Sequence, residues 1–154
     1  MIDGRSEDAK LLLEPLHPSA KKYLFFPVND SEHHDKEGGT HWSLLVYSRL
    51  ENTFYYFDSV HNRNNYATTK IIEVLRAVLN CQSAFSISYP STQQQNLYDC
   101  GIYVICNVEN IIKHILRGSG VVRHVAELNK DAVSTKTSEI LKIVAELGGI
   151  FACG

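Results

Sequence analysis

The most informative stretch of this sequence is Tyr98-Asp99-Cys100-Gly101-Ile102-Tyr103-Val104-Ile105-Cys106. It joins a polar, glutamine-rich loop to an apolar segment that predicts a helix, so Cys100 lies at the helix N-terminus. Backbone N–H groups without helical partners and the positive end of the helix dipole favour the thiolate there. Because the thiolate is the attacking form of cysteine, Cys100 is a candidate nucleophile. Cys106 lies further along the same helix among apolar residues and is predicted to be part of the core.

A candidate base and a candidate carboxylate lie upstream, on two predicted strands. His41 follows the turn Gly38-Gly39 and begins the strand 41–47, and Asp58 follows the strand 53–57. The polar segment between the strands favours an antiparallel hairpin, which would place Asp58 beside His41. The carboxylate would then hold one imidazole tautomer and stabilise the imidazolium. Each residue is also compatible with an ordinary strand-end position.

The run Gln93-Gln94-Gln95 precedes the candidate nucleophile and is either a polar turn or the source of an oxyanion donor. The side-chain amide of Gln94 could donate to a developing negative oxygen, with the backbone N–H of Cys100 as a second donor. Loss of one such donor typically lowers turnover about a hundred- to a thousand-fold. With His41 as base, these residues predict covalent acyl transfer, in which Cys100 attacks a carbonyl, a thioester forms and water releases the acid.

Size and composition restrict the classes of function. The chain has 154 residues, of which 44% are hydrophobic, and a formal net charge of −2. We therefore predict a single domain, 1–154, with a real core. Nucleic-acid binding is not expected because no basic block exists, and the apolar runs are too short to cross a membrane. Four cysteines without a signal-peptide pattern are typical of reduced thiols, so we expect the cytoplasm and the nucleus.

No metal or other cofactor is predicted, since no cysteine and histidine spacing matches a zinc site. The group His33-His34-Asp35 and the residue His61 are predicted to be solvated in polar loops. Cys81 and Cys153 do not lie at the N-terminus of a predicted helix after a polar loop, as Cys100 does. A monomer is expected.

Local patterns predict several strands with most helices late in the chain. Apolar residues at helical spacing predict a helix over 71–79, and strict alternation predicts a strand over 85–89. Pro27 marks the first strand as an edge strand or a strand end. This order favours an α+β fold over a regularly alternating one. The predicted strands are 21–28, 41–47, 53–57 and 85–89, and the predicted helices are 71–79, 102–116 (stopped by Gly118 and Gly120), 121–128 and 134–147.

Three stretches of the sequence carry a resemblance to a known family: Leu13-Glu14-Pro15-Leu16, the run from Gly38 to Tyr47, and the run from Gln94 to Asn107. They resemble the Ulp/sentrin-specific cysteine proteases, closest to the deneddylase branch (sentrin-specific protease eight type). The resemblance covers about 11–110 and leaves 111–154 as a divergent helical part. It implies a papain-like α+β core. It also implies hydrolysis after the C-terminal Gly-Gly of the neddylation modifier, in precursors or in conjugates such as those of cullins.

Matched position by position, the resemblance implies that His41, Asp58 and Cys100 form the triad and that Gln94 is the oxyanion glutamine. It implies that Trp42 covers the modifier's Gly-Gly. A flat ring beside the base would leave a slot that fits glycine, whereas the other interpretation of Trp42 is a core tryptophan.

Members of this family carry a further N-terminal segment with a Trp-Leu-Asn-Asp stretch that this sequence lacks. We therefore expect an N-terminally truncated form that exposes apolar surface and has an incomplete groove. The activity of such an isolated chain is in question.

Three other functions compete with a protease for the neddylation modifier. The first is a protease for a SUMO-type modifier, and the second is a modifier-binding module that has lost turnover. The third is an acyltransferase that uses the same thioester chemistry with an acceptor other than water. Tyr98 and the run Gln94-Gln95-Asn96 favour the neddylation modifier over a SUMO-type protein.

Overall fold

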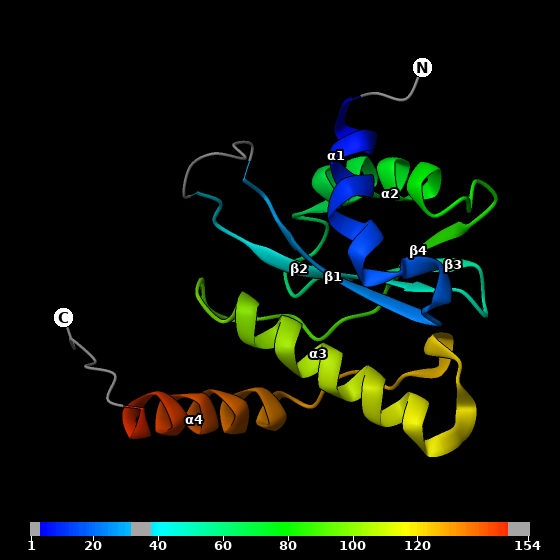
Figure 1. The fold of residues 1–154 in the computed structure, drawn as a ribbon. Coiled ribbons are helices and arrows are strands. Elements are labelled where there is room, and N and C mark those ends of the chain that lie inside the picture. The colour runs from blue at the N-terminus through cyan, green and yellow to red at the C-terminus, as the bar shows by residue number, and fades with distance from the viewer. Residues whose placement is uncertain (1–3, 32–37, 148–154) are drawn as a thin grey trace.

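The computed structural model describes residues 4–31 and 38–147. Its helices are α1 (Gly4–Leu13), α2 (Asn65–Val78), α3 (Cys100–His114) and α4 (Lys130–Glu146), and its strands are β1 (Tyr23–Asn29), β2 (Trp42–Ser48), β3 (Thr53–Phe57) and β4 (Phe85–Tyr89). Short helical turns are η1 (Glu14–Leu16), η2 (Pro18–Ala20), the π-helical turn η3 (Ile115–Ser119) and η4 (Val122–His124). Helices α1 and α2 lie on one side of the sheet and α3 and α4 on the other (Figure 1).

The sheet has the strand order β1-β2-β3-β4. Strands β1, β2 and β3 form an antiparallel meander, and β4 pairs parallel to β3. The predicted hairpin between β2 and β3 is confirmed, with Ser48 opposite Thr53 and Leu44 opposite Phe57. Strand β1 lies at the edge of the sheet, as Pro27 predicted, because proline has no N–H to donate to a second neighbour.

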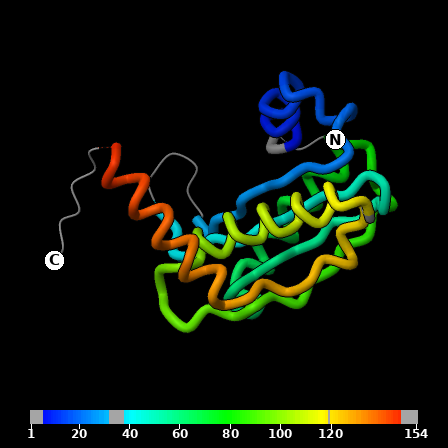
Figure 2. Tube along the Cα trace, turned by 90° about the horizontal axis from the view of Figure 1, so that it is seen from below, coloured from blue at the N-terminus to red at the C-terminus, as the bar shows by residue number. Residues whose placement is uncertain are grey.

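The two central strands, β2 and β3, are buried on both faces except at Trp42. Leu45 and Tyr47 of β2 pack in a cluster with Leu75 of α2, whereas Leu44 and Val46 pack with Ile111 of α3. Seen from below, α3 runs along the sheet and α4 leans outward from it (Figure 2). Burial on both faces explains why β2 and β3 are continuous apolar runs rather than alternating ones. The predicted α+β class is therefore confirmed.

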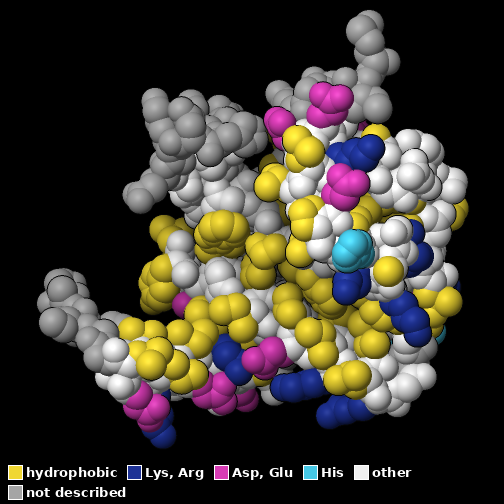
Figure 3. All heavy atoms as spheres, viewed as in Figure 1, with side chains coloured by type: hydrophobic (Ala, Val, Ile, Leu, Met, Phe, Trp, Pro, Cys, Tyr) yellow, Lys and Arg dark blue, Asp and Glu magenta, His cyan; other side chains and the backbone are white. Residues whose placement is uncertain are grey.

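The second edge strand, β4, has the predicted bounds but exposes its apolar side chains. Phe85 and Ile87 are exposed, and so are Leu116 near the end of α3 and Leu147 after α4. Figure 3 shows apolar side chains over α3 and along α4 on the face that it presents. The expectation of exposed apolar surface is met.

Two segments differ from the prediction. Residues 4–13 form α1, where no helix was predicted, and the helix predicted over 121–128 is wrong because only the turn η4 forms there. Val122 and Val125 of this segment are buried beneath the sheet, and the Glu51 carboxylate accepts the Val122 backbone N–H at 2.7 Å. Long-range contacts thus hold the segment in an irregular path.

The late helices otherwise follow the prediction. Helix α3 gives way to η3, in which Gly118 has a φ of 112°, and Gly120 follows with a φ of 62°. Helix α4 begins at Lys130, earlier than predicted, because Asn129 caps it by accepting the Asp131 N–H at 3.0 Å. No helix among residues 4–31 and 38–147 is long and apolar enough to span a membrane.

Candidate active site

The hairpin brings His41 and Asp58 together. His41 directly precedes β2 and Asp58 directly follows β3, so the antiparallel register puts them at the same end of the sheet. The His41 Nε2 atom lies 2.5 Å from Asp58 Oδ1, and the two side chains are only 2% and 5% exposed. A contact this short between buried side chains fixes the ring orientation and leaves Nδ1 for a second partner.

The Asp58 carboxylate accepts four hydrogen bonds. Oδ1 accepts from His41 Nε2 and from the Val60 N–H at 3.0 Å, and Oδ2 accepts from the Tyr56 hydroxyl and from the Asn64 N–H at 3.2 Å. Burial, together with the bond to Asp58, raises the pKa of Tyr56 well above its ordinary value, so its hydroxyl stays a donor. A buried carboxylate is stable only when its lone pairs are used in this way.

The backbone of His41 is held by Asp30, which follows β1. Asp30 Oδ1 accepts the His41 N–H at 2.9 Å and the Thr40 N–H at 2.5 Å. Burial alone would raise the pKa of Asp30, but the hydrogen bonds from Thr40 and His41 lower it below its ordinary value. Gly39 makes this turn possible: its φ is 83°, and a Cβ there would lie 1.8 Å from Asn29 Oδ1.

Cys100 is the first residue of α3, as the sequence predicted, and it is 6% exposed. The side chain of Asp99, the residue before α3, makes no capping bond to this helix, and its carboxylate accepts from Asn96 Nδ2 at 2.7 Å. A Cβ added at Gly101 would meet nothing within 4 Å, so open space adjoins the thiol's neighbour. The candidate nucleophile is therefore largely enclosed but borders open space.

The structure does not join the Cys100 thiol to His41. Helix α3 packs against β2 and begins at the end of the sheet where His41 lies (Figures 1 and 2). No hydrogen bond between the two side chains occurs in the described part of the chain. In enzymes without substrate such bonds are often long, and they tighten in the complex. His41 Nδ1 is the atom that could accept the thiol proton.

Cys106 is the internal control for Cys100, and its prediction as a core residue is confirmed. It is 5% exposed and packs with Tyr103 and Val133 between α3 and α4. Burial, followed by the nearby Glu109 charge, raises the pKa of its thiol. Burial does not separate the two cysteines, whereas position along the helix does.

The remaining cysteines and histidines that the sequence analysis singled out lie outside the candidate active site or outside the described residues. Cys81 is buried in the cluster that α2 covers, and His61 is exposed, as predicted. Cys153 and the group His33-His34-Asp35 lie outside the described residues. In the ranges 4–31 and 38–147, no group of three His, Cys, Asp or Glu side chains is placed to hold a metal ion.

Gln94 binds the loop before α3 to the segment after Asp58. Its backbone N–H donates to the Ser59 carbonyl at 2.9 Å, and its Oε1 accepts the Ser59 hydroxyl at 2.7 Å. Its Nε2 donates to the Asn96 carbonyl at 2.7 Å. An amide nitrogen carries two N–H groups, so one remains available to another acceptor.

Trp42 begins β2 beside His41 and is 44% exposed. The interpretation as a core tryptophan is therefore not supported. Its exposed ring, on the residue after the candidate base, is available to a ligand.

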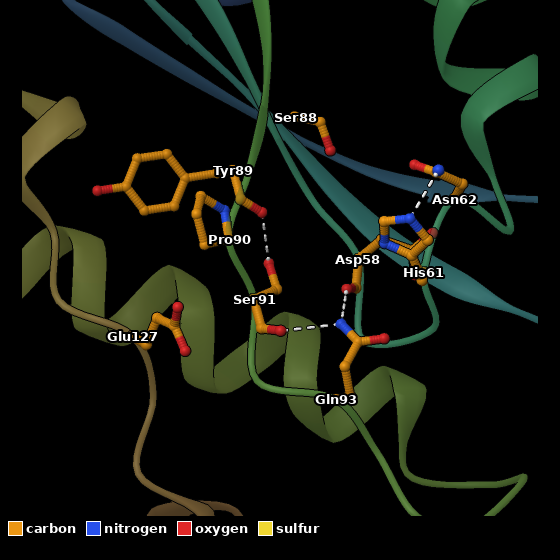
Figure 4. Close-up of a pocket in the computed structure, with 9 residues that line it drawn as sticks. All are labelled: Asp58, His61, Asn62, Ser88, Tyr89, Pro90, Ser91, Gln93 and Glu127. Atoms are coloured by element: carbon orange, nitrogen blue, oxygen red, sulfur yellow. Dashed lines mark hydrogen bonds between the residues drawn. The ribbon is translucent and has the colours of Figure 1, made fainter.

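Next to Asp58, at the ends of β3 and β4, lies a pocket of about 660 Å³ that the sequence did not predict (Figure 4). Gln93 spans one side of it, with Nε2 donating to the carbonyls of Asp58 at 3.0 Å and Ser91 at 2.8 Å. The pocket is lined by Asp58, His61, Asn62, Ser88, Tyr89, Pro90, Ser91, Gln93 and Glu127.

Sequence reasoning also missed Asn64. It lies in the polar run after His61, which was predicted to be an exposed turn, but Asn64 is 1% exposed. No local signal marks it, because it is one of three asparagines in the same polar run, with Asn62 and Asn65.

A buried histidine–aspartate pair on a sheet, opposite a helix that begins with cysteine, is the architecture of papain-like cysteine proteases. The family described as the Ulp1 protease family, C-terminal catalytic domain, matches residues 13–140. The chain belongs to this family.

Curated relatives agree with this membership. Over 110 residues the chain is 39% identical to sentrin-specific protease 8 of Homo sapiens, which covers 70% of this chain and 51% of that protein. It is 31% identical over 150 residues to NEDD8-specific protease 1 of Arabidopsis thaliana, covering 92% of this chain and 66% of that protein. The chain spans about half the length of the mammalian relatives that it matches.

Solved structures support the fold. The C-terminal Ulp1 protease domain in complex with Smt3, the yeast ortholog of SUMO, aligns with a TM-score of 0.57 at 24% identity, covering 85% of this chain and 58% of that one. The Xanthomonas campestris effector XopD bound to ubiquitin aligns with a TM-score of 0.59 at 19% identity, covering 90% of this chain and 70% of that one.

Proposed function

We propose that this chain is a thiol protease domain that cleaves after the C-terminal Gly-Gly of a ubiquitin-like modifier, and that the modifier is NEDD8. The observation that carries the proposal is the 2.5 Å contact between His41 Nε2 and Asp58 Oδ1, both buried, in a chain of the Ulp1 protease family. A structural histidine at a strand end needs no such enclosed carboxylate partner. The pair is suited to hold a proton during catalysis.

The proposed mechanism begins with transfer of the Cys100 proton to His41 Nδ1. The thiolate attacks the carbonyl carbon of the terminal glycine, and Asp58 stabilises the imidazolium that forms. The oxyanion accepts the backbone N–H of Cys100, which has no partner within the helix, and the second N–H of Gln94 Nε2. The imidazolium then protonates the leaving amine, leaving a thioester. Water hydrolyses it, giving its proton to His41, from which the thiolate regains it.

Specificity for Gly-Gly is assigned to Trp42. Trp42 directly follows the proposed base in the chain, and its exposed ring would lie against a substrate backbone without side chains. The names of the relatives, among them NEDD8-specific protease 1 of Arabidopsis thaliana, support NEDD8 over a SUMO-type modifier. We further propose that the conjugates include cullins and that the protein acts in the cytoplasm and the nucleus.

A NEDD8 probe with a thiol-reactive C-terminus tests this function. The chain is incubated with the probe, and the covalent adduct is followed by gel shift and by mass spectrometry of the modified peptide. We expect an adduct at Cys100 that Cys100→Ala abolishes. Cys106→Ala is the matched control, because that cysteine lies in the same helix and is buried to nearly the same degree, at 5% against 6%. An adduct that survives Cys100→Ala contradicts the proposal, and faster labelling by a SUMO probe reassigns the modifier.

A modifier-binding module without turnover is the second candidate. The observation that favours it is the lack of a hydrogen bond between Cys100 and His41 in the described residues. Calorimetric titration with unreactive NEDD8 separates the two candidates, since binding without labelling identifies the module.

A further inference from the structure

The side chain of Asn64 is turned into the protein beneath the histidine–aspartate pair. Asn64 is 1% exposed and immediately precedes α2. Its Nδ2 donates to the carbonyls of Val28 at 3.1 Å and His41 at 3.2 Å and to the Ser43 hydroxyl at 3.0 Å. The residue thereby connects the ends of β1 and β2 to the start of α2.

The backbone of the same residue binds the other member of the pair. The Asn64 N–H donates to Asp58 Oδ2 at 3.2 Å and to the Tyr56 hydroxyl at 3.1 Å. One residue thus contacts His41 through its side chain and Asp58 through its main chain. The distance between these two contacts is set by the covalent geometry of a single residue.

The orientation of the amide is determined by its surroundings. If the amide were rotated by 180°, Oδ1 would face the carbonyl oxygens of Val28 and His41, and acceptors do not bind acceptors. In the observed orientation Oδ1 is buried and has no hydrogen-bond partner within the described residues. A buried acceptor without a partner destabilises a fold and calls for a reason to be kept.

Asn64 occupies the cap position of α2 but does not use its side chain to cap that helix. Asparagine before a helix commonly accepts an N–H of the first turn, but the side chain of Asn64 makes no such capping bond to α2. The residue forgoes the interaction that its position favours and binds the backbone of His41 instead.

We propose that Asn64 is a positioning residue for the His41–Asp58 pair. It fixes the His41 backbone relative to the Asp58 carboxylate, so that Nε2 meets Oδ1 and Nδ1 points away from it. The expected effect on kcat rests on the proposed protease function, whereas the expected effect on the geometry of the pair does not.

Asn64→Ser and Asn64→Asp test the proposal, because both residues are favoured helix caps and neither retains the donor amide. The matched control is Asn65→Ala, the adjacent asparagine, which is exposed on the same helix. On a NEDD8 C-terminal fusion we expect kcat to fall roughly ten- to a hundred-fold in both variants, with KM nearly unchanged, as misplacement of a reacting group predicts. Asn65→Ala should match the parent chain.

A second measurement is independent of turnover. The His41 Nε2–H proton, hydrogen-bonded to Asp58, should give a downfield, slowly exchanging NMR signal in the parent chain. We expect this signal to shift and to exchange faster in Asn64→Ser while circular dichroism still shows a folded chain. If the parent chain has no activity, the protease function fails but this signal still tests the positioning role.

A variant that keeps both the parental kcat and the parental Nε2–H signal overturns the proposal. So does failure of both variants to fold, because Asn64 would then be needed for the fold as a whole rather than for the pair.

Discussion

At the scale of single residues, the site depends on the buried Asp58 carboxylate and on the groups that donate hydrogen bonds to it. Asp58 accepts from four groups, and one of them, the Tyr56 hydroxyl, also accepts the Asn64 N–H. Because Asp58 is buried, loss of any of these donors leaves part of the negative charge of its carboxylate without a hydrogen-bond partner. The neighbours of Asp58 therefore matter for the position of His41 as well as for stability.

The Tyr56 hydroxyl is the most direct test of this dependence. Tyr56→Phe removes only the hydroxyl, so we expect a loss of about 1–3 kcal/mol in the free energy of unfolding and a lower kcat. Urea denaturation and steady-state kinetics give both values. Tyr47→Phe is the control, because the Tyr47 hydroxyl donates to Asn52 at 3.1 Å, far from His41. Equal loss of activity in the two variants would contradict a specific role for Tyr56.

Gly39 is the second residue whose replacement should affect His41. Gly39→Ala would place a Cβ 1.8 Å from Asn29 Oδ1 and force alanine to a φ of 83°. We expect a loss of about 1–3 kcal/mol in the free energy of unfolding, measured in urea, and reduced labelling of Cys100 by the NEDD8 probe. In Gly38→Ala the nearest atom is Ser31 Oγ at 3.2 Å, so this control should lose less. Parental labelling by Gly39→Ala would show that this turn does not set the position of His41.

The sequence was sufficient to predict that His41 and Asp58 lie side by side at the ends of paired strands and that Cys100 begins a helix, because strand ends, turns and a helix start are local patterns. Asn64 and Asp30 could not be predicted in the same way. Asn64 binds the carbonyl of Val28, 36 residues away, and Asp30 binds backbone N–H groups across a loop. Nearly every residue carries the same backbone N–H and C=O groups, so the sequence does not reveal which of them a side chain will bind.

At the scale of elements, a single carboxylate connects the hairpin to the segment after α3. Glu51 follows β2, its side chain is only 2% exposed, and it accepts from the Tyr55 hydroxyl at 2.7 Å and the Val122 N–H at 2.7 Å. Arg123 Nε adds a third bond at 3.1 Å. These contacts attach the segment after α3 to the hairpin between β2 and β3.

The same contacts predict how stability depends on pH. Burial alone would raise the pKa of Glu51, but its hydrogen bonds lower it below the ordinary 4.5. A folded-state pKa below the unfolded one means that the stabilisation is present above pH 4.5 and is lost as the pH falls through the folded value. Glu51→Gln should lower the free energy of unfolding at pH 7 and reduce its decline in acid. Urea titrations at several pH values measure both effects.

Glu73→Gln serves as the control for Glu51→Gln, because Glu73 is exposed on α2 and the structure gives it no hydrogen bond or ion pair among the described residues. It should follow the parent chain at every pH. An acid decline of the same steepness in Glu51→Gln would show that other carboxylates carry the dependence.

The helices and strands were predicted correctly where a repeating pattern of apolar residues or a turn marks their ends, and less well elsewhere. The strands 53–57 and 85–89 have the predicted bounds, because polar turn residues delimit the first and alternation marks the second. Helix α2 extends further towards the N-terminus than predicted, since its first turns carry polar residues outside the apolar stripe. Exposure of Phe85 and Ile87 in β4 could not be foreseen, because alternation does not reveal whether the inner face of an edge strand is covered.

At the scale of the whole molecule, the outer helix layer is attached far more weakly than the inner ones. Helix α4 buries one of its side chains, Val133, against Tyr103 and Cys106, while Leu141 and Ile143 are exposed. Lys136 adds one ion pair across to Glu109 of α3 at 2.9 Å, whereas its pair with Glu139 at 2.6 Å lies within α4. Exposed ion pairs contribute little, so docking of α4 depends chiefly on Val133.

The thiol of Cys106 reports whether α4 stays docked, because it is buried beneath this helix. Val133→Ala should weaken docking by about 0.5–3 kcal/mol, and each 1.4 kcal/mol increases the open population about tenfold. In a Cys100→Ala background, we expect alkylation of Cys106 to accelerate accordingly, followed by mass spectrometry of the labelled peptide. Val144→Ala removes the same atoms from an exposed position of the same helix and should leave the rate unchanged. An unchanged rate in Val133→Ala would mean that Cys106 becomes accessible through movement of α3 itself, so that α4 and the start of α3 at Cys100 move as one unit.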